Sequence, residues 1–407
     1  MNVFDIVAAN KKCTGCGSCQ SICKKRAIRI QMNSVGFYEC VVEKAKCIDC
    51  GLCLKVCPAK TDMSDYKLRD AEMYAVQANA QEVVQNSSSG GVAHVLSELA
   101  IDMGYSVVGV AYDYEANKAV HRIANDSTQI KAFDGSKYLQ SYTADAFSKI
   151  VVEAKKNRES NYLVVGTPCQ IAGLANLTDI LGIRSQFVLI EFFCHGVPTY
   201  YLWEEELRQL SSKTNGEQIQ AIRFRSKKYG WHTFCMECRT ANHTVFRRRE
   251  TDFFWNVYFE NMMLNRCCYL CSYKGEQTSA DIRIGDYWGK KFENRSDGVS
   301  LVFACSTVGK SWLDKCCSER KLKILEKSSY EDALLPQSME SKHTSLHTQV
   351  QDKLEAHLPI KKVVSSYRKQ QSFKEKLKRC ILKTSILIPA KVKSALRSVY
   401  RKCIFYK

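Results

Sequence analysis

The spacing of hydrophobic and polar residues predicts both strands and helices along this chain. Residues 27–38 alternate in polarity and contain an Asn-Ser-x-Gly turn signal, which is typical of a β-hairpin. Residues 92–103 have helical periodicity, and Gly104 marks the expected end of that helix. Residues 105–112 then predict a buried strand.

Three short apolar runs farther along the chain predict interior strands, at residues 161–166, 187–193 and 280–286. Each run ends in a polar or glycine-containing loop. Sheets in α/β proteins place their ligand sites in the loops that follow such strands. We therefore expect functional residues directly after these three runs.

The length and the cysteine content restrict the class of protein. A chain of 407 residues is too long for one ordinary core and predicts two or three domains. The apolar stretches are far shorter than the ~20 residues of a membrane span, and Met1–Lys12 lacks a secretory pattern, so we expect a cytoplasmic protein. In a reducing compartment, an odd total of 21 cysteines argues against a disulfide framework and favours metal ligands.

Two cysteine runs near the N-terminus share one spacing. Each has three cysteines separated by two residues and a fourth after three more: Cys13, Cys16, Cys19 and Cys23, then Cys47, Cys50, Cys53 and Cys57. In ferredoxin-type proteins the first three thiolates bind one 4Fe-4S cluster and the fourth binds the other. The expected ligand sets are Cys13, Cys16, Cys19 and Cys57 for one cluster and Cys47, Cys50, Cys53 and Cys23 for the second.

A pair of zinc sites is the alternative for these runs. Zinc uses Cys-x-x-Cys pairs with longer spacers rather than triplets with an offset fourth cysteine, so the spacing favours iron–sulfur clusters. Lys24 stands where the second run has Pro58, which is a small departure. Cys40 fits neither run, and we expect it to be a buried thiol.

The cysteines of the main body are dispersed. Cys169 and Cys194 each follow a predicted strand, and Cys268 and Cys271 form a Cys-x-x-Cys pair. Four such thiols are enough for a third 4Fe-4S cluster. The spacing also leaves open buried apolar thiols, a zinc site or a redox disulfide, with Cys267 in place of Cys268 or Cys235 and Cys238 as the donor pair.

A series of ordered segments carries a family resemblance: NSSSGG (86–91), GSKYLQS (135–141), GTPCQIAGL (166–174), FCHGVP (193–198), FRSKKYGW (224–231), CCYLC (267–271) and ADIRIGDYWG (280–289). Over roughly residues 70–310 the chain resembles the beta-subunit family of coenzyme F-420 hydrogenases and dehydrogenases, in which a ferredoxin module commonly precedes this body. The resemblance implies a flavin, FAD or FMN, beside the clusters. It also implies the third 4Fe-4S cluster at Cys169, Cys194, Cys268 and Cys271.

The flavin would bind at two loops of the body. Ser88, Ser89, Gly90 and Gly91 precede a predicted helix, whose first amides suit a phosphate, although an ordinary N-cap with a turn is the alternative. Lys137 would pair with the phosphate or the flavin ring; a solvated surface lysine is the other interpretation.

Two segments after predicted strands complete the candidate site. Asp286 and Trp288 would line the cofactor pocket, although a tryptophan in a core is common. His195 would donate to a cluster sulfur or to substrate, or else serve as a structural histidine. The sequence assigns no catalytic residue.

The C-terminal tail carries most of the net charge. Residues 361–407 account for +14 of the total of +18, and the cations alternate with apolar residues in partly helical spacing at 373–383 and 390–405. A basic amphipathic helix is typical of contact with a membrane surface or a partner, and a solvated tail is the alternative. The body lacks an aromatic and basic motif for nucleic acid, so we do not expect nucleic acid as a partner.

These observations predict an α+β protein with a small ferredoxin-like N-terminal domain, a larger mixed α/β body that holds flavin and clusters, and a basic helical tail. The expected boundaries are 1–62 for the ferredoxin-type domain, 70–155 and 156–335 for the two parts of the body, and 340–407 for the tail.

The predicted function is that of an iron–sulfur, flavin-dependent oxidoreductase. It would relay electrons from the ferredoxin-type clusters to a flavin and then to a small-molecule or deazaflavin-type acceptor. We expect a ferredoxin-like or other redox partner, an oligomer, and a place at the inner membrane face. The alternatives are a non-catalytic electron-transfer subunit, with a tie to surface-polysaccharide biosynthesis, and a cluster-based redox sensor.

Overall fold

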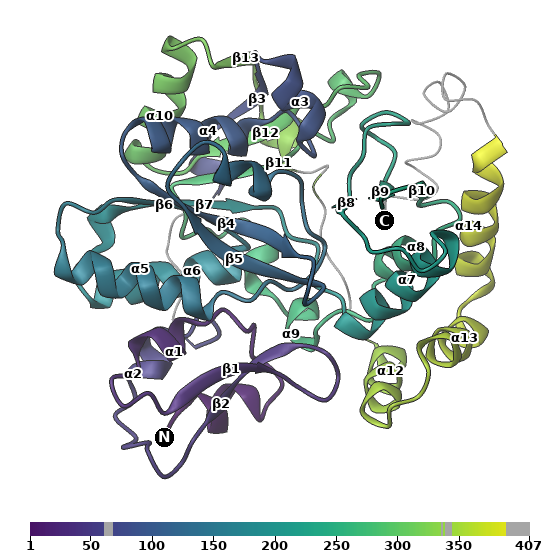
Figure 1. Ribbon diagram of the computed structural model, residues 1–407, viewed down its shortest axis with the longest axis horizontal. Helices are drawn as coiled ribbons and strands as arrows, with labels where there is room; N and C mark the ends of the chain where they lie inside the picture. The colour runs from purple at the N-terminus through teal and green to yellow at the C-terminus, as the bar shows by residue number, and fades with distance from the viewer. Residues whose placement is uncertain (61–67, 335–336, 338–343, 388–407) are drawn as a thin grey trace.

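The chain folds into an N-terminal cysteine-rich domain, a central sheet with helices on both faces, and a C-terminal group of helices (Figure 1). This computed structural model describes residues 1–60, 68–334, 337 and 344–387. The mixed α and β architecture, with a small domain before a larger body, confirms the predicted fold class. None of the described helices is long and apolar enough to cross a membrane.

The N-terminal domain contains α1 (Ser18–Ile22), β1 (Ile28–Met32), β2 (Tyr38–Val42) and α2 (Leu52–Lys55). β1 and β2 pair antiparallel, which confirms the predicted hairpin. Both short helices follow a glycine in the left-handed region, Gly17 (φ 83°) and Gly51 (φ 74°). Because residues with a Cβ rarely adopt this conformation, the glycine between the second and third cysteine of each run lets the chain turn tightly there.

The central sheet has eight strands in the order β13-β3-β12-β11-β7-β6-β4-β5. Its strands are β3 (Glu72–Ala78), β4 (Ser106–Asp113), β5 (Lys118–Ala124), β6 (Tyr162–Gly166), β7 (Phe187–Phe192), β11 (Ile282–Asp286), β12 (Ser300–Ala304) and β13 (Leu322–Lys327). They come from both parts of the predicted body, so residues 70–155 and 156–335 build one sheet. The four strands β4, β6, β7 and β11, predicted from their apolar runs, lie side by side at its centre.

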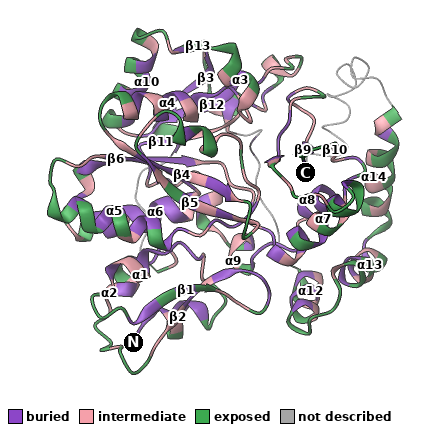
Figure 2. Ribbon diagram, in the orientation of Figure 1, coloured by how far each residue is buried: buried purple, intermediate pink, exposed green. Residues whose placement is uncertain are grey.

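Helices cover both faces of this sheet. They are α3 (Gln81–Asn86), α4 (Val92–Asp102), α5 (Ala144–Lys156), α6 (Pro168–Ile180), α10 (Thr307–Ser318) and α11 (Tyr330–Ala333). Figure 1 shows α4 and α10 over one face and α5 and α6 over the other, with the N-terminal domain below α5 and α6. Each face buries its own apolar cluster, with Leu96 and Leu99 in one and Phe147 and Ile171 in the other (Figure 2).

The parallel pairing of β6, β7 and β11 determines where the site forms. β6 pairs parallel with β7, and β7 pairs parallel with β11, so the three strands end at the same edge. Cys169, Cys194 and Asp286 follow or end these strands and therefore lie near that edge. This is the position at which open α/β sheets bind their ligands.

The remaining helices and a small sheet form the C-terminal group. They are α7 (Tyr200–Lys213), β8 (Ala221–Arg223), β9 (Cys235–Arg239), β10 (Thr244–Arg248), α8 (Phe253–Phe259), α9 (Arg266–Tyr269), α12 (Ser345–Glu355), α13 (Ile360–Gln370) and α14 (Phe373–Thr384). The predicted tail is thus helical over 345–384, and its second predicted helical stretch, 390–405, lies outside the described residues.

The tail helices α12 and α13 are part of the protein core. Val350, Leu354 and Val363 are buried in the same apolar cluster as Trp203 and Trp255. By contrast, α14 has no buried residue. The first two tail helices therefore complete the body, and only the third has the exposure of a surface appendage.

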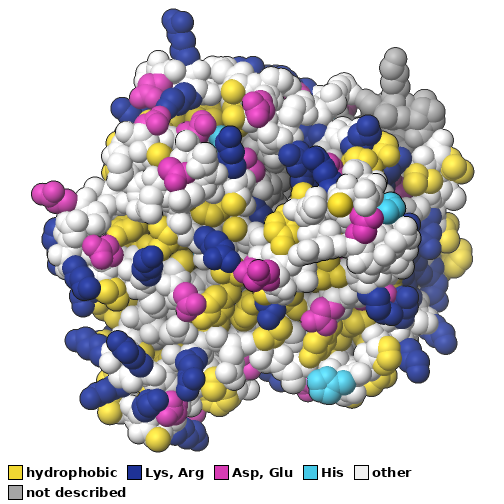
Figure 3. All heavy atoms as spheres, in the orientation of Figure 1, with side chains coloured by type: hydrophobic (Ala, Val, Ile, Leu, Met, Phe, Trp, Pro, Cys, Tyr) yellow, Lys and Arg dark blue, Asp and Glu magenta, His cyan; other side chains and the backbone are white. Residues whose placement is uncertain are grey.

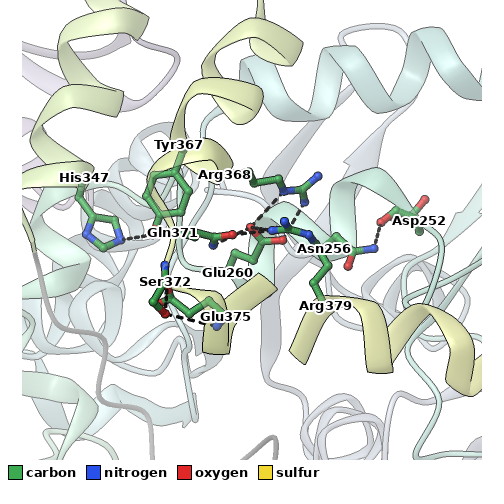
Figure 4. Close-up of polar contacts among 10 residues, drawn as sticks. All are labelled: Asp252, Asn256, Glu260, His347, Tyr367, Arg368, Gln371, Ser372, Glu375 and Arg379. Atoms are coloured by element: carbon green, nitrogen blue, oxygen red, sulfur yellow. Dashed lines mark hydrogen bonds and ion pairs between the residues drawn. The ribbon is translucent and has the colours of Figure 1, made fainter. Parts of the chain in front are cut away.

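Glu260 holds α13 and α14 against the end of α8. Its carboxylate accepts hydrogen bonds from Arg368 at 2.7 and 3.2 Å and from Gln371 at 3.2 Å, and it forms an ion pair with Arg379 at 3.7 Å (Figure 4). Two arginines on one partly buried carboxylate fix how the tail leaves the body.

Candidate functional site

The fold gathers the first cysteine run around the last cysteine of the second run. Burial raises the pKa of the Cys57 thiol to about 12, and the neighbouring Cys16 and Cys13 add to this effect. A hydrogen bond with Cys40 lowers the pKa of the Cys19 thiol, but burial and the nearby Cys16, Cys13 and Cys57 raise it overall. The four residues predicted to share one cluster therefore lie together, and we call them the inner set.

The other run lies nearer the surface. Burial raises the pKa of the Cys53 thiol, with contributions from Cys50 and Cys47. Cys23 ends α1, and its sulfur accepts a hydrogen bond from the Ala27 amide at 3.4 Å. The assignment of Cys23 to Cys47, Cys50 and Cys53, which together we call the outer set, stays a prediction.

Cys40 is fully buried, as expected, but it is not remote from the site. It lies on β2 and hydrogen-bonds with the thiols of Cys13 and Cys19. The alternation of β2 could have indicated this position, because Tyr38 and Cys40 share the inward face of the strand.

The dispersed cysteines of the body also come together. Burial raises the pKa of Cys194 to about 12, with contributions from Cys268 and Cys271. The pKa of Cys169 is raised by burial and by Cys271 and Cys194. We call Cys169, Cys194, Cys268 and Cys271 the body set.

The alternative cysteine ligands, Cys267 and the pair Cys235 and Cys238, differ in where they lie relative to the body set. Cys267 lies within it and hydrogen-bonds with Cys268. Cys235 and Cys238 are buried on β9, where their neighbours include Arg248 and Glu206 rather than the body thiols. The structure therefore does not place this rival pair at the body set.

Local sequence explains how Cys169 is placed. Thr167 caps α6, Pro168 occupies its first turn, and the side chain of Gln170 completes a capping box. Both residues are typical of a helix start, so GTPCQ puts Cys169 in the first turn of α6. Thr167 Oγ1 lies 3.3 Å from the Cys169 sulfur.

The inner and body sets meet across α6. A Cβ on Gly173, one helical turn after Cys169, would lie 2.9 Å from the Cys16 sulfur. Tyr273 lies between the sets, because burial and thiols of both sets raise the pKa of its phenol: Cys169 and Cys271 of the body set, Cys16 and Cys57 of the inner set. Its hydroxyl donates to Pro58 O at 3.2 Å. The α6 backbone at Gly173 and the Tyr273 side chain therefore lie where the two groups of thiols approach each other.

The donor chemistry fits iron–sulfur clusters better than a single ion. Among the described residues, no group of three or more His, Cys, Asp or Glu side chains is placed to hold one metal ion. In a 4Fe-4S cluster each thiolate binds a different iron, so the ligand sulfurs surround a cube and do not converge on one point. The three sets of thiols, of which only Cys50 is exposed, meet this requirement in their donor type.

A cavity of about 580 Å³ opens beside the body set, at the edge where the parallel strands end. Cys194 and His195 form part of its wall, together with Lys137, Tyr138 and Trp288. Its volume is within the range of cofactor pockets, and its walls are mainly apolar and aromatic. The described end of the tail contributes Leu382 and Ser385.

The Ser/Gly loop lies at this cavity, but several of its polar groups already have partners. Ser88 and Ser89 line the cavity, as does Gly91, which precedes α4. Ser89 Oγ donates to Val299 O at 2.8 Å, and the Gly90 amide donates to Ser300 Oγ at 2.9 Å. These hydrogen bonds fix the loop to the start of β12. Gly90 takes part in this attachment and does not line the cavity.

Lys137 is half-buried in the wall and is not a solvated surface lysine. Its Nζ donates to Ala132 O at 3.0 Å and to Asp134 O at 2.9 Å, and burial lowers its pKa to about 7. These two carbonyl oxygens use two of the three ammonium hydrogens, and the nearby Asp134 carboxylate favours the charged form. Lys137 remains available to an anionic group in the cavity.

His195 is held by its neighbours. Its Nε2 hydrogen-bonds with Asn261 Oδ1, and its ring lies 5.0 Å from the Tyr258 ring. Burial lowers its pKa to about 4, so the imidazole is neutral near pH 7. The structure thus gives His195 a place in the wall and a fixed partner.

Asp286 lines the cavity, yet both of its carboxylate oxygens are engaged. Oδ2 accepts from Arg225 at 3.0 Å, and Oδ1 accepts from Trp231 Nε1 at 2.7 Å. Trp231 stacks on Trp288 with ring centres 5.6 Å apart. Sequence analysis missed Arg225 and Trp231, although both stand in the FRSKKYGW segment that was part of the resemblance.

Comparisons with known proteins find matches in two parts of the chain. Residues 159–329 match the family described as the C terminus of the beta subunit of coenzyme F420 hydrogenase/dehydrogenase, and residues 12–61 match the 4Fe-4S dicluster domain. No curated protein matches. A chain of the F420-reducing NiFe hydrogenase complex from Methanosarcina barkeri, studied by xenon derivatization, is similar at 14% identity, with a TM-score of 0.48 over 73% of this chain and 94% of that chain.

The fold and the cysteine sets define an iron–sulfur electron-transfer oxidoreductase. Residues 159–329 are thus similar to the C terminus of the coenzyme F420 hydrogenase/dehydrogenase beta subunit, and residues 12–61 match a domain that holds two 4Fe-4S clusters.

Proposed function

We propose that this protein transfers electrons between a protein partner at its N-terminal domain and a flavin in the 580 Å³ cavity. The single observation that carries the proposal is the order of the sites in space. The outer set reaches the surface at Cys50, and the inner set contacts α6. The body set begins on α6, and its Cys194 lines the cavity. Bound clusters would supply one-electron transfer, and a bound flavin would connect single electrons with hydride chemistry.

The residues of the cavity have distinct roles in this proposal. Lys137 would pair with an anionic part of the flavin, either its phosphate or its ring, because its two carbonyl partners leave one ammonium hydrogen for a ligand. Asp286 would act through Arg225 and Trp231, which it holds in place. The third 4Fe-4S cluster, at the body set, and a small-molecule or deazaflavin-type acceptor belong to the same proposal.

The test is the composition of protein purified without oxygen. Three clusters require about twelve irons per chain and two require about eight. We expect about twelve, with one flavin. Cys169→Ala is expected to remove about four of these irons and Cys50→Ala a different four, which electron paramagnetic resonance distinguishes by the signals that disappear. Stoichiometric zinc in place of iron, or an unchanged iron content in both variants, would contradict the proposal.

The exposed tail helix supports a contact with a membrane surface. On α14, Phe373 (79% exposed), Leu377 (48%) and Ile381 (38%) recur every four residues and form one stripe. Lys374 and Lys378 lie on one flank of the stripe and Lys376 and Lys383 on the other, at the helical repeat. A helix of this kind lies in the headgroup region of anionic lipids.

Co-flotation of the full chain with vesicles tests this contact. We expect binding to vesicles that contain phosphatidylglycerol and not to pure phosphatidylcholine, and we expect Phe373→Ser with Leu377→Ser to abolish it. The matched control is Val152→Ser with Val308→Ser, which removes exposed apolar side chains elsewhere. Equal binding by the two double variants would refute the contact.

A further inference from the structure

The outer set is the part of the cysteine relay that reaches the protein surface. Cys50 is exposed and Cys47 is half-buried, whereas Cys16, Cys19 and Cys57 of the inner set are buried. Between the two outer cysteines, the side chain of Ile48 is 63% exposed. A partner that exchanges electrons with this chain therefore has its closest approach at residues 47–50.

Basic residues flank the cysteines of the outer set in the sequence. Lys24, Lys25 and Arg26 directly follow Cys23, Lys44 and Lys46 precede Cys47, and Lys55 lies between Cys53 and Cys57. All six side chains are exposed. In Figure 3, Lys and Arg side chains gather over the N-terminal domain, at the lower left of the view.

The nearby acidic side chains are already paired. Glu43 forms ion pairs with Lys46 at 2.8 Å and Arg29 at 3.4 Å, and Asp49 pairs with the amino group of Met1 at 3.3 Å. Residues 1–60 contain ten Lys or Arg and four Asp or Glu, while residues 61–360 have a net charge of −2. The positive field is thus local to the end of the molecule that exposes the outer set.

We propose that this face docks a small acidic protein that carries a one-electron centre, of the ferredoxin or flavodoxin class. An exposed apolar side chain ringed by charges has the anatomy of a protein interface, and a basic ring selects an acidic partner. This inference rests on the proposed electron transfer. Each encounter moves one electron between the partner's centre and the outer cluster, so that one is oxidised and the other reduced, with no bond made or broken.

The same charges do not have the features of a nucleic-acid site. Proteins that bind single strands stack bases on exposed aromatic side chains. The aromatic residues of this domain are Phe4, Phe37 and Tyr38, and each is buried or half-buried. Attraction between exposed charges is screened by salt, so binding should depend strongly on salt.

Binding of an oxidised, acidic plant-type 2Fe-2S ferredoxin to the full chain, measured by calorimetry at several salt concentrations, tests the proposal. We expect affinity to fall as salt rises. Lys24→Glu with Lys25→Glu should weaken binding at low salt by about tenfold or more, because each exposed charge contributes a few-fold. The matched control, Lys213→Glu with Lys323→Glu, changes the net charge equally at exposed sites on α7 and β13. Its affinity for ferredoxin should stay within about twofold of that of the unmodified chain.

Iron content and the cluster signals separate this inference from the proposed function. Both double variants should keep the iron of the unmodified chain, and stopped-flow mixing with reduced ferredoxin should slow only in the Lys24 and Lys25 variant. Ferredoxin affinity that is insensitive to salt, or equal in the two variants, would overturn the docking face while leaving the clusters intact. Equal competition by a short DNA duplex would overturn it as well, since it would show a general polyanion site.

Discussion

The two groups of cysteines in this protein are built in different ways. The N-terminal sets come from two short runs within residues 13–57, whereas the body set is assembled from residues 169, 194, 268 and 271. Spacing positions the thiols within each run, because one short helix and its loop hold them close together. The second group exists only because β6, β7 and β11 end at the same edge of one sheet. A local ligand set should therefore survive damage to the body, and the body set should not.

Arg283 offers the strongest way to test this difference. It is fully buried, pairs with Glu191, and donates to Gly275 O at 2.9 Å and Gln277 O at 2.6 Å, which holds the chain just after Cys271. Arg283→Met leaves a buried carboxylate without its partner, which costs about 3–5 kcal/mol of folding free energy. We expect loss of about four irons from the body set, with the signals of the N-terminal clusters retained. Loss of all iron in a folded variant would show that the groups are not independent.

Gly173 tests the contact between the groups. In Gly173→Ala the new Cβ would lie 2.7 Å from Ser18 Oγ and 2.9 Å from Cys16 Sγ, so one side must move. We expect about 1–3 kcal/mol of destabilisation, measured by chemical denaturation, and slower electron exchange between inner and body clusters. Ser18→Ala in the same chain should restore part of the stability. A fully additive double variant would contradict the contact.

Lys137 tests the cavity without involving either group of cysteines. Its folded pKa of about 7 lies below the ordinary 10.5, so burial of the charged form is costly below pH 7 and the cost disappears as pH rises to about 10.5. We expect Lys137→Met to raise the melting temperature by about 2–4 °C at pH 7 and to weaken flavin binding. The gain in stability should vanish above pH 10.5. A gain that is independent of pH would show that charge burial is not its cause.

Glu260 should have the smallest effect, confined to the tail. Glu260→Gln removes the carboxylate that binds Arg368 and Arg379, and we expect a loss of about 1 kcal/mol and faster proteolysis after residue 370. The control is Glu375→Gln, at the capping box of exposed α14. Glutamine also serves in a capping box, so this control should alter proteolysis less. Equal cleavage rates would mean that Glu260 does not anchor the tail.

Much of the framework could be predicted from local patterns. The hairpin, the helix that begins at Val92, and the four strands at the centre of the sheet are where periodicity and apolar runs placed them. The tail was only partly predicted: helical spacing was correct over 373–383, but α12 and α13 belong to the core. A basic, amphipathic pattern does not tell which helices find an apolar partner, because that depends on surfaces distant in the sequence.

The candidate site divides in the same way. Spacing by itself indicated the two ferredoxin runs, since three of the four ligands expected for each cluster are neighbours in the chain. Tertiary structure decided that Cys235 and Cys238 lie apart from the body set, that Cys40 contacts inner thiols, and that Arg225 and Trp231 take up the carboxylate of Asp286. These contacts join residues tens of positions apart, and only the packing of the sheets with their helices brings them within reach of one another.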